Sequence, residues 1–303
     1  MKMSAHTIDV TILTCQKYLN PKVITTYEQN ILDERKLITQ ALEDLGLKVH
    51  CTAWDDAEFD WSQTRAVVFR TIWDYFERYD EFSAWIEIVK AKTQLVNSYD
   101  LIQWNIDKHY LEDLQNKGVA IVPTEYVDTG SYRSIAEVCL ERDWQDVVIK
   151  PAIAGGAFHT HKVLEFERAD YEEVFENLVA ERDMLIQPFV PTISSRGEAS
   201  LMVFNGKFTH AILKKPKQGD YRVQDDWGGT VHPYSPTQEE ITFAEDCFKA
   251  CNTMPAYGRA DILWGENGDI LLGELEIVEP ELWIRNDPAS ARQFAQGVLK
   301  ALV

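Results

Sequence analysis

The sequence predicts an α/β protein that changes to α+β in its C-terminal part. Short β-branched runs alternate with helical periodicity in the first hundred residues, which is typical of a parallel sheet with crossover helices. From Met184 onward, strand-like runs follow one another through tight turns, which indicates antiparallel pairing. The chain has 303 residues. At about 150 residues per domain, that length favours two domains and leaves one or three open.

The N-terminal region contains the clearest alternation of strands and helices. The residue after the first long helical stripe is Gly46, which suits the left-handed position that ends many helices. We expect strands at 8–13, 47–53 and 66–71, and helices at 31–45 and 82–90.

The middle and C-terminal regions contain shorter elements. Asn205-Gly206 is a strong hairpin signal between two strand-like runs. Residues 217–234 hold three glycines and show no periodicity, so we interpret them as a functional loop. We expect helices at 108–116, 171–179, 238–251 and 289–302, and strands at 119–127, 147–150, 158–164, 198–204, 207–214, 257–264 and 270–277.

The charge balance restricts the partners of the protein. Asp and Glu number 49 against 30 Lys and Arg, a formal charge of −19. Such a chain is not expected to bind nucleic acid or an anionic membrane, although a local basic pocket could hold a nucleotide. Five cysteines without CxxC spacing favour reduced thiols. The sequence shows no apolar stretch of signal or membrane-spanning length, so we expect a cytoplasmic protein.

Three carboxylates near the C-terminus form the most informative pattern. Glu274 and Glu276 alternate on one expected strand and therefore share a face. Asp261 can join them if its strand pairs with theirs. Carboxylates that lie so near to one another repel each other unless a cation lies among them. Hard oxygen ligands of this kind suit Mg²⁺. The alternative is a solvated polar face of an antiparallel sheet.

A second pattern joins Lys150 to the glycine pair Gly155 and Gly156. An apolar strand that ends in lysine, followed by a loop of small residues, can present a cation and backbone amides to phosphate. Neither a Walker loop nor a dinucleotide-binding GxGxxG is present. The alternative is an ordinary surface turn.

Two further segments fit a nucleotide site. The run Gln187, Pro188, Phe189 and Val190 could frame an adenine with its main chain, or could simply be a strand that ends at proline. Arg222 lies in a glycine-bounded loop, from which its planar guanidinium could close over a phosphoryl group.

The substrate residues are expected at the end of the strand 66–71, because ligands of open α/β sheets lie at the carboxyl ends of strands. Arg70 could hold a substrate carboxylate, with Asp74 or Tyr75 near an amine. Arg285 could reach a phosphate or the substrate. The alternative for Arg70 is an interdomain ion pair surrounded by aromatic packing.

Taken in order, these segments resemble the ATP-grasp superfamily, in the branch similar to prokaryotic glutathione synthetases and ribosomal-protein glutamate ligases. The resemblance runs from about residue 100 to the C-terminus. The motifs GlyAspTyrArgValGln and GluLeuGluIleValGluPro also resemble those of the D-cycloserine-forming cyclo-ligase and its relatives.

The resemblance implies a role for each motif. Lys108 and Lys150 would hold ATP phosphates beneath the Gly155–Gly156 loop, and residues 187–190 would frame the adenine. Glu198 would contact the nucleotide, and Arg222, together with Lys150, would act in catalysis at the γ-phosphoryl group. Asp261, Glu274 and Glu276 would bind two Mg²⁺ ions, with Mn²⁺ as an alternative. Glu276 stands where these ligases commonly carry Asn.

The implied activity is an ATP- and Mg²⁺-dependent carboxylate–amine ligase that makes an amide or peptide bond on a small amino-acid-like substrate through an acyl-phosphate. Two alternatives stay open: an intramolecular cyclo-ligase of the D-cycloserine type, and an ATP-binding protein without catalysis. The implied fold has an N-terminal α/β substrate domain (1–104), a central lid subdomain (105–183) and a C-terminal subdomain with the metal site (184–303). Homo-oligomerisation is left open.

Overall fold

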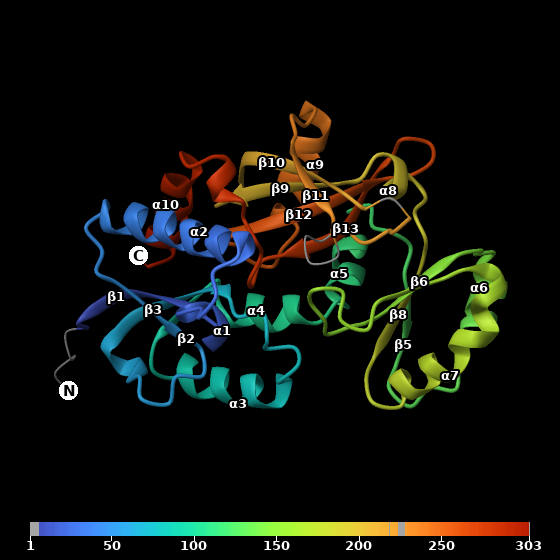
Figure 1. Ribbon diagram of the computed structural model, residues 1–303, viewed down its shortest axis with the longest axis horizontal. Helices are drawn as coiled ribbons and strands as arrows, with labels where there is room; N and C mark the ends of the chain where they lie inside the picture. Colours follow the sequence, from blue (N-terminus) through green and yellow to red (C-terminus); the bar gives the residue numbers. More distant parts are fainter. Residues whose placement is uncertain (1–5, 218, 224–227, 303) are drawn as a thin grey trace.

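The computed structural model describes residues 6–217, 219–223 and 228–302. Three sheets organise these residues: a four-stranded parallel sheet, a four-stranded sheet and a five-stranded antiparallel sheet. In Figure 1 the parallel sheet lies at the N-terminal end of the long axis, the five-stranded sheet lies above and beside it, and the second four-stranded sheet forms a separate lobe at the far end. The predicted change from α/β to α+β is confirmed.

The N-terminal sheet has the strand order β2-β1-β3-β4, all parallel. The longest helix, α2, begins with a capping box in which Thr25 and Glu28 satisfy the first free amides. The elements of this part are β1 (Ile8–Thr14), α1 (Gln16–Leu19), α2 (Thr26–Glu43), β2 (Val49–Ala53), β3 (Thr64–Thr71), α3 (Tyr79–Lys90), β4 (Gln94–Val96) and α4 (Tyr99–Ile106).

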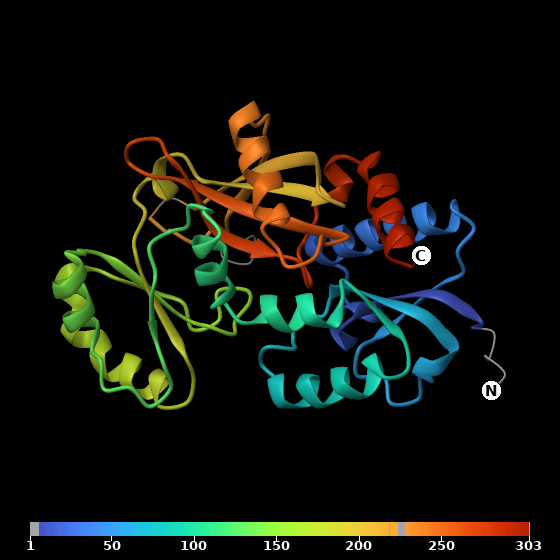
Figure 2. The same ribbon diagram turned by 180° about the vertical axis from the view of Figure 1, so that it is seen from behind.

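The separate lobe is built on the strand order β5-β8-β6-β7, which the helices α6 and α7 cover on one side (Figure 1). Its core is small and apolar, and includes Ile149, Phe175 and Ile186. The elements are α5 (Tyr110–Asn116), β5 (Glu125–Val127), α6 (Ile135–Arg142), β6 (Val147–Pro151), β7 (His161–Val163), α7 (Arg168–Val179) and β8 (Met184–Pro188). The helix α5 precedes the lobe in sequence, and Figure 2 shows it against the five-stranded sheet.

The five-stranded sheet has the order β11-β10-β9-β12-β13. Asn205 and Gly206 take positive φ angles of 50° and 76° between β9 and β10, so the predicted hairpin is confirmed. The elements are α8 (Thr192–Ser195), β9 (Glu198–Phe204), β10 (Lys207–Lys215), β11 (Thr230–Pro233), α9 (Gln238–Lys249), β12 (Tyr257–Trp264), β13 (Ile270–Glu276) and α10 (Ser290–Ala301).

Two expected strands are shorter than the sequence predicts. Of residues 119–127, only Glu125–Val127 is a strand, because Ile121 instead makes an isolated parallel bridge to Leu272 of β13. Of residues 158–164, only His161–Val163 pairs with β6. In both cases the apolar residues of the sequence indicate that the segment is buried. They cannot show which backbone groups hydrogen-bond to a partner strand.

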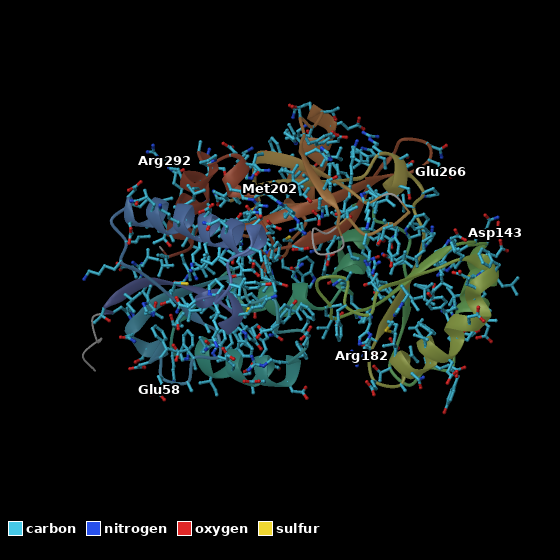
Figure 3. All side chains as sticks on the ribbon, in the orientation of Figure 1. Glu58, Asp143, Arg182, Met202, Glu266 and Arg292 are labelled. Atoms are coloured by element: carbon cyan, nitrogen blue, oxygen red, sulfur yellow. The ribbon has the colours of Figure 1, made fainter. Side chains whose placement is uncertain are left out.

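The packing between the N-terminal part and the five-stranded sheet is polar as well as apolar. Asn97 is buried and donates to the carbonyl oxygens of Tyr257 (2.9 Å) and Ile277 (2.7 Å), and it accepts a bond from the amide of Ala256. Met202, fully buried on β9, packs in the same core as α2 and α10 (Figure 3). These contacts hold the two sheets in a fixed relationship at one wall of the cavity described below.

The predicted domain boundaries stay a prediction. The structure adds that Tyr110, Leu111 and Leu114 of α5 belong to the core of the five-stranded sheet.

Candidate active site

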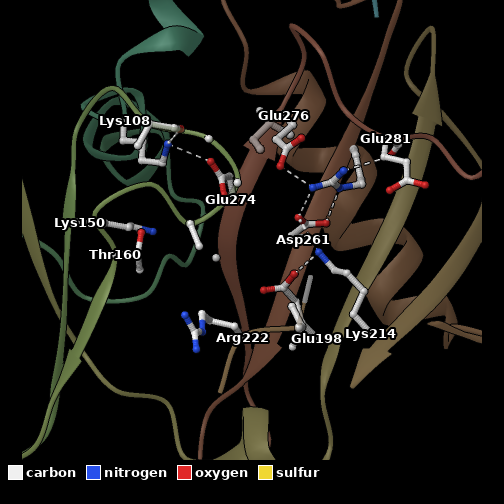
Figure 4. A pocket seen from close by; sticks show the side chains of 18 of the residues that line it. Lys108, Lys150, Thr160, Glu198, Lys214, Arg222, Asp261, Glu274, Glu276 and Glu281 are labelled. Atoms are coloured by element: carbon white, nitrogen blue, oxygen red, sulfur yellow. Dashed lines mark hydrogen bonds and ion pairs between the residues drawn. The ribbon is translucent and has the colours of Figure 1, made fainter. Parts of the chain in front are cut away.

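A cavity of about 500 Å³ lies where the three sheets approach one another. Its wall takes residues from the N-terminal part, from the lobe and from the five-stranded sheet. Figure 4 shows Lys150 and Thr160 of the lobe on one side of it, and the carboxylates of β12 and β13 on the other. The residues predicted for phosphate, adenine and metal binding all line this cavity: Lys108, Lys150, Gly155, Gly156, Gln187, Pro188, Phe189, Val190, Glu198, Arg222, Asp261, Glu274 and Glu276.

The three carboxylates lie together because of the register of β12 and β13. Asp261 is directly opposite Glu274, and Arg259 is directly opposite Glu276. Residues two apart on a strand share a face, so all four side chains point to the same side. Figure 4 shows this group at the centre of the cavity wall.

Each of the four carboxylates that β9, β12 and β13 contribute to this wall has a cationic partner. Asp261 is 2.7 Å from Arg259 and 3.1 Å from Lys214, and accepts a hydrogen bond from the Ser200 hydroxyl at 2.5 Å. Glu274 is 3.1 Å from the Lys108 ammonium. The two remaining carboxylates form ion pairs of the same kind, Glu276 with Arg259 and Glu198 with Lys214.

The protonation of the wall follows from this pairing. Burial, together with the charges of Glu274 and Asp261, raises the pKa of Glu276 to about 8 despite Arg259. For Glu274, burial is outweighed by Lys108 and Lys150, which lower its pKa. Burial and the Lys108 charge lower the pKa of Lys150, while Glu274 opposes them. The group therefore holds closely spaced carboxylates under strong mutual repulsion.

These residues fit a divalent cation. The carboxylates of Asp261, Glu274 and Glu276 supply hard oxygen donors on one face, which is the chemistry Mg²⁺ prefers. The raised pKa of Glu276 shows that ionisation of this carboxylate is disfavoured here, and a divalent ion would relieve that cost.

The phosphate candidates come from the lobe and from the segment between α4 and α5. Lys108 donates to the carbonyl of Ala154 at 2.6 Å, which ties this lysine to the loop that contains Gly155. Gly155 itself lies against Phe76, so that a Cβ at this position would be 2.8 Å from the Phe76 ring. The loop can pack this closely against the Phe76 ring only with glycine at this position.

The adenine candidates lie at the end of β8. The Gln187 side chain donates to the Thr124 hydroxyl at 2.8 Å, and the Phe189 amide donates to the Asp146 carbonyl at 2.8 Å. The amide of Phe189 is thus already used, and its ring lines the cavity beneath the ammonium of Lys162 at 3.5 Å.

Arg222 also faces the cavity, from the glycine-bounded loop. Asp220 pairs with its guanidinium at 2.8 Å. The Tyr221 hydroxyl donates to the Thr160 carbonyl at 3.2 Å and accepts a bond from the Lys162 amide at 3.1 Å. The arginine loop and the glycine loop are therefore joined directly. Part of the predicted loop, residues 218 and 224–227, lies outside the described residues.

Of the four predicted substrate residues, one lines the cavity and three do not. Tyr75 lines the cavity. Arg70 is 4% exposed and forms an ion pair with Glu34 of the same N-terminal part at 2.7 Å, so the pair is not the interdomain one of the alternative; only its hydrogen bond to the Pro280 carbonyl, at 2.8 Å, reaches another part of the chain. The other two also have carboxylate or arginine partners and do not line the main cavity: Asp74 pairs with Arg78, and Arg285 pairs with Glu281.

Sequence reasoning missed several charged residues of the wall, among them Arg259, Lys214 and Glu279. Arg259 precedes Asp261 by two on the same strand, a spacing that could have placed it on the same face. Lys214 is the inward residue of β10 opposite Glu198. Glu279 follows the end of β13, where no periodicity marks it.

Comparison with known proteins extends over most of the chain. Residues 10–97 match the model of the N-terminal domain of D-cycloserine synthetase DcsG, and residues 113–253 match the ATP-grasp domain of prokaryotic glutathione synthetase. The cycloserine biosynthesis protein DcsG of Streptomyces lavendulae is 29% identical over 286 residues, covering 88% of this chain and 92% of the relative.

Comparison with solved structures shows the same similarity. The crystal structure of D-cycloserine synthetase DcsG superposes with a TM-score of 0.86 and 26% identity, covering 97% of this chain and 99% of that chain. The chain belongs to the ATP-grasp ligases. A more distant member, PsnB, solved with its minimal precursor, Mg and ADP, shares the fold at a TM-score of 0.60 and 13% identity, covering 97% of this chain and 98% of that chain.

The resemblance drawn from the motifs is therefore confirmed, and with it the expectation of an enzyme. The match of residues 10–97 extends the similarity to a part of this ATP-grasp ligase for which the motifs gave little information. Within the described ranges, no helix is both long and apolar enough to cross a membrane.

Proposed function

We propose that this ATP-grasp ligase uses ATP and Mg²⁺ to activate the carboxylate of a small amino-acid-like substrate as an acyl-phosphate, which an amine then attacks to form an amide. The observation that carries this proposal is the meeting of Asp261, Glu274 and Glu276 with Lys108 and Lys150 around one cavity. Binding of a nucleotide's phosphates with their metal ion requires carboxylates that hold the metal and lysines that hold the phosphates.

Each part of the nucleotide would lie against a different wall of the cavity. The ring of Phe189 and the side chain of Val190 offer an apolar surface to the adenine. The ammonium groups of Lys108 and Lys150 would bind the phosphates, with the Gly155 loop closing over them. Glu198 lies between these walls and would face the ribose.

Mg²⁺ would be held by Asp261, Glu274 and Glu276, and when bound it neutralises charge on the phosphate oxygens. Because Arg259 pairs with both Asp261 and Glu276, its guanidinium lies beside the same carboxylates and can bind a phosphate or substrate oxygen. Two ions and the use of Mn²⁺ stay predictions.

The chemistry assigned to the chain is positioning and electrostatic stabilisation. Transfer of the γ-phosphoryl group to the substrate carboxylate releases ADP, and amine attack on the acyl-phosphate forms the amide and releases phosphate. Arg222 would leave Asp220 to bind the transferring group. Its loop is joined to the glycine loop through Tyr221, so both would close together and exclude water.

Ring closure within one molecule is the form of this reaction that we favour. The similarity to D-cycloserine synthetase spans 88% of this chain and includes the N-terminal domain, which supports a related substrate. Joining of two separate molecules is the second candidate, and ATP binding without catalysis is the third. A cytoplasmic location and a homo-oligomeric state stay predictions.

The test is an assay of ADP and phosphate release with ATP, Mg²⁺ and a panel of amino acids and their hydroxylamine or urea derivatives, followed by mass spectrometry of the product. A product derived from one substrate molecule with loss of a leaving group supports ring closure. A product equal to two substrates minus water supports intermolecular ligation. Tight ATP binding without any substrate-dependent ADP release would contradict the proposed ligase activity.

A further inference from the structure

Glu279 differs from the other buried or half-buried carboxylates that line the cavity. Five of these have a lysine or arginine partner within 4.0 Å: Glu198, Asp261, Glu274, Glu276 and Glu281. Among the described residues, none of the ion pairs includes Glu279. A carboxylate that faces a cavity and forms no ion pair with a lysine or arginine is a natural anchor for a cationic group of a ligand.

The position of Glu279 is fixed by the loop that follows β3. Trp73 donates its indole N–H to the Glu279 carbonyl at 2.8 Å, and Tyr75 lies beside the Glu279 carboxylate and lowers its pKa. Both aromatic residues come from the carboxyl end of a parallel strand, where ligands of such sheets lie. Burial, together with the charge of Glu274, raises the pKa of Glu279 to about 7 against the effects of Tyr75 and Lys108, as expected for a carboxylate that lacks a counter-ion.

The cavity wall beside Glu279 is aromatic. Trp73 lies 5.6 Å from Tyr18 and 6.3 Å from Tyr27, measured between ring centroids, and all three residues line the cavity. The Lys17 ammonium already lies 4.8 Å from the Tyr18 ring, so this wall accepts a cation. Aromatic faces beside a carboxylate are the chemistry that recognises an organic ammonium group.

We infer that Glu279, oriented by Tyr75, binds the free primary ammonium group of the substrate, and that the substrate class is an unacylated amino acid derivative. This inference rests on the proposed function, which places the reacting carboxylate near Arg259 and the metal ligands. The ammonium end of the substrate then points away from the phosphates toward the aromatic wall. Acylation of the amine removes its charge and prevents binding.

The experiment measures binding by calorimetry with Mg²⁺ and ADP present. The probes are D-cycloserine, D-serine and D-alanine, each with its N-acetyl form. We expect at least one amine to bind the unaltered protein at least 10-fold more tightly than its N-acetyl form. Glu279→Gln should weaken that amine at least 10-fold, and Tyr75→Phe about threefold. Glu77→Gln, the same change at an exposed residue of the rim, should alter the affinity less than twofold.

Affinity for Mg²⁺-ADP in every variant reports whether the fold and the nucleotide site are intact, and it should not change. The inference is overturned if Glu279→Gln binds the amines as tightly as the unaltered protein, if N-acetyl forms bind equally well, or if none of the three amines binds. Absence of Mg²⁺-ADP binding to the unaltered protein would instead contradict the proposed function, and the amine comparison is then made without nucleotide.

Discussion

Asp261 on β12 and Glu274 on β13 lie directly opposite each other, yet their cationic partners come from different parts of the chain. Asp261 pairs with Lys214 of β10, whereas Glu274 pairs with Lys108, which lies between α4 and α5. The metal candidates are thus connected to the hairpin and to the segment that leads into the lobe.

Glu274→Gln should abolish substrate-dependent ADP release, with a loss of at least about 100-fold, because one of the proposed Mg²⁺ ligands loses its charge. The amide keeps the shape of the side chain and can accept a bond from Lys108. Steady-state ADP formation at increasing Mg²⁺ checks this. Glu266→Gln, on the turn after β12, is the matched control, and full activity of Glu274→Gln would remove the metal assignment.

Lys214→Met should destabilise the protein by about 3 kcal/mol, because it leaves Asp261 and Glu198 buried with one cationic neighbour fewer. The neighbouring Lys215 is exposed, so Lys215→Met should change the free energy of unfolding by less than about 0.5 kcal/mol. Urea unfolding of both variants at pH 7 measures the difference. Equal stability of the two would show that the Lys214 ion pairs contribute nothing net.

Glu279→Gln should stabilise the ligand-free protein in a pH-dependent way. The pKa of Glu279 is raised in the folded state to about 7, so the folded protein retains a proton there that the unfolded chain loses near pH 4.5. The contribution of Glu279 to stability therefore falls as pH rises from about 4.5 to about 7, and is constant above.

Relative to the unaltered protein, the variant should gain about 3 kcal/mol across that window and no more at higher pH. Unfolding by urea at pH 5, 6, 7 and 8 checks the curve. A difference that is the same at all four values would mean that the carboxylate titrates normally.

Arg222→Ala should lower kcat by about 100-fold or more and change ATP affinity little, because the arginine is assigned to the transferring phosphoryl group. Arg222→Lys should recover only part of the rate, since an ammonium cannot bind two oxygens in a planar fork. Arg292→Ala, at an exposed helix position, is the control. A rise in KM for ATP with unchanged kcat would place Arg222 in nucleotide binding alone.

Much of the fold follows from the sequence because its signals are local. The hairpin at Asn205-Gly206 and the alternation on β13 depend on turn geometry and strand period, which neighbouring residues determine. The sequence did not predict the helix α4 or the strand β4, because eight residues of helix and three residues of strand show too little periodicity. Their existence depends on packing against β3, at a distance in the chain.

The residues of the candidate site also fall into those that the sequence predicts and those that it does not. Residues in ordered motifs, such as Lys150 and Glu274, reached the cavity as the sequence suggests. Arg70 did not, because Glu34 on α2 neutralises it, and nothing in the sequence links residues 36 positions apart. Glu279 belongs to the motif GluLeuGluIleValGluPro, but the sequence assigned it no role, since its distinction is the lack of an ion pair among the described residues, which only a three-dimensional arrangement reveals.

The most direct test is the affinity for a non-hydrolysable ATP analogue, measured by calorimetry with and without Mg²⁺ in the unaltered protein and in Glu274→Gln. If these carboxylates hold a metal-bound nucleotide, Mg²⁺ strengthens binding at least 10-fold in the unaltered protein, and this gain is lost in the variant. Binding that is independent of Mg²⁺, or a gain that survives in Glu274→Gln, would contradict the account.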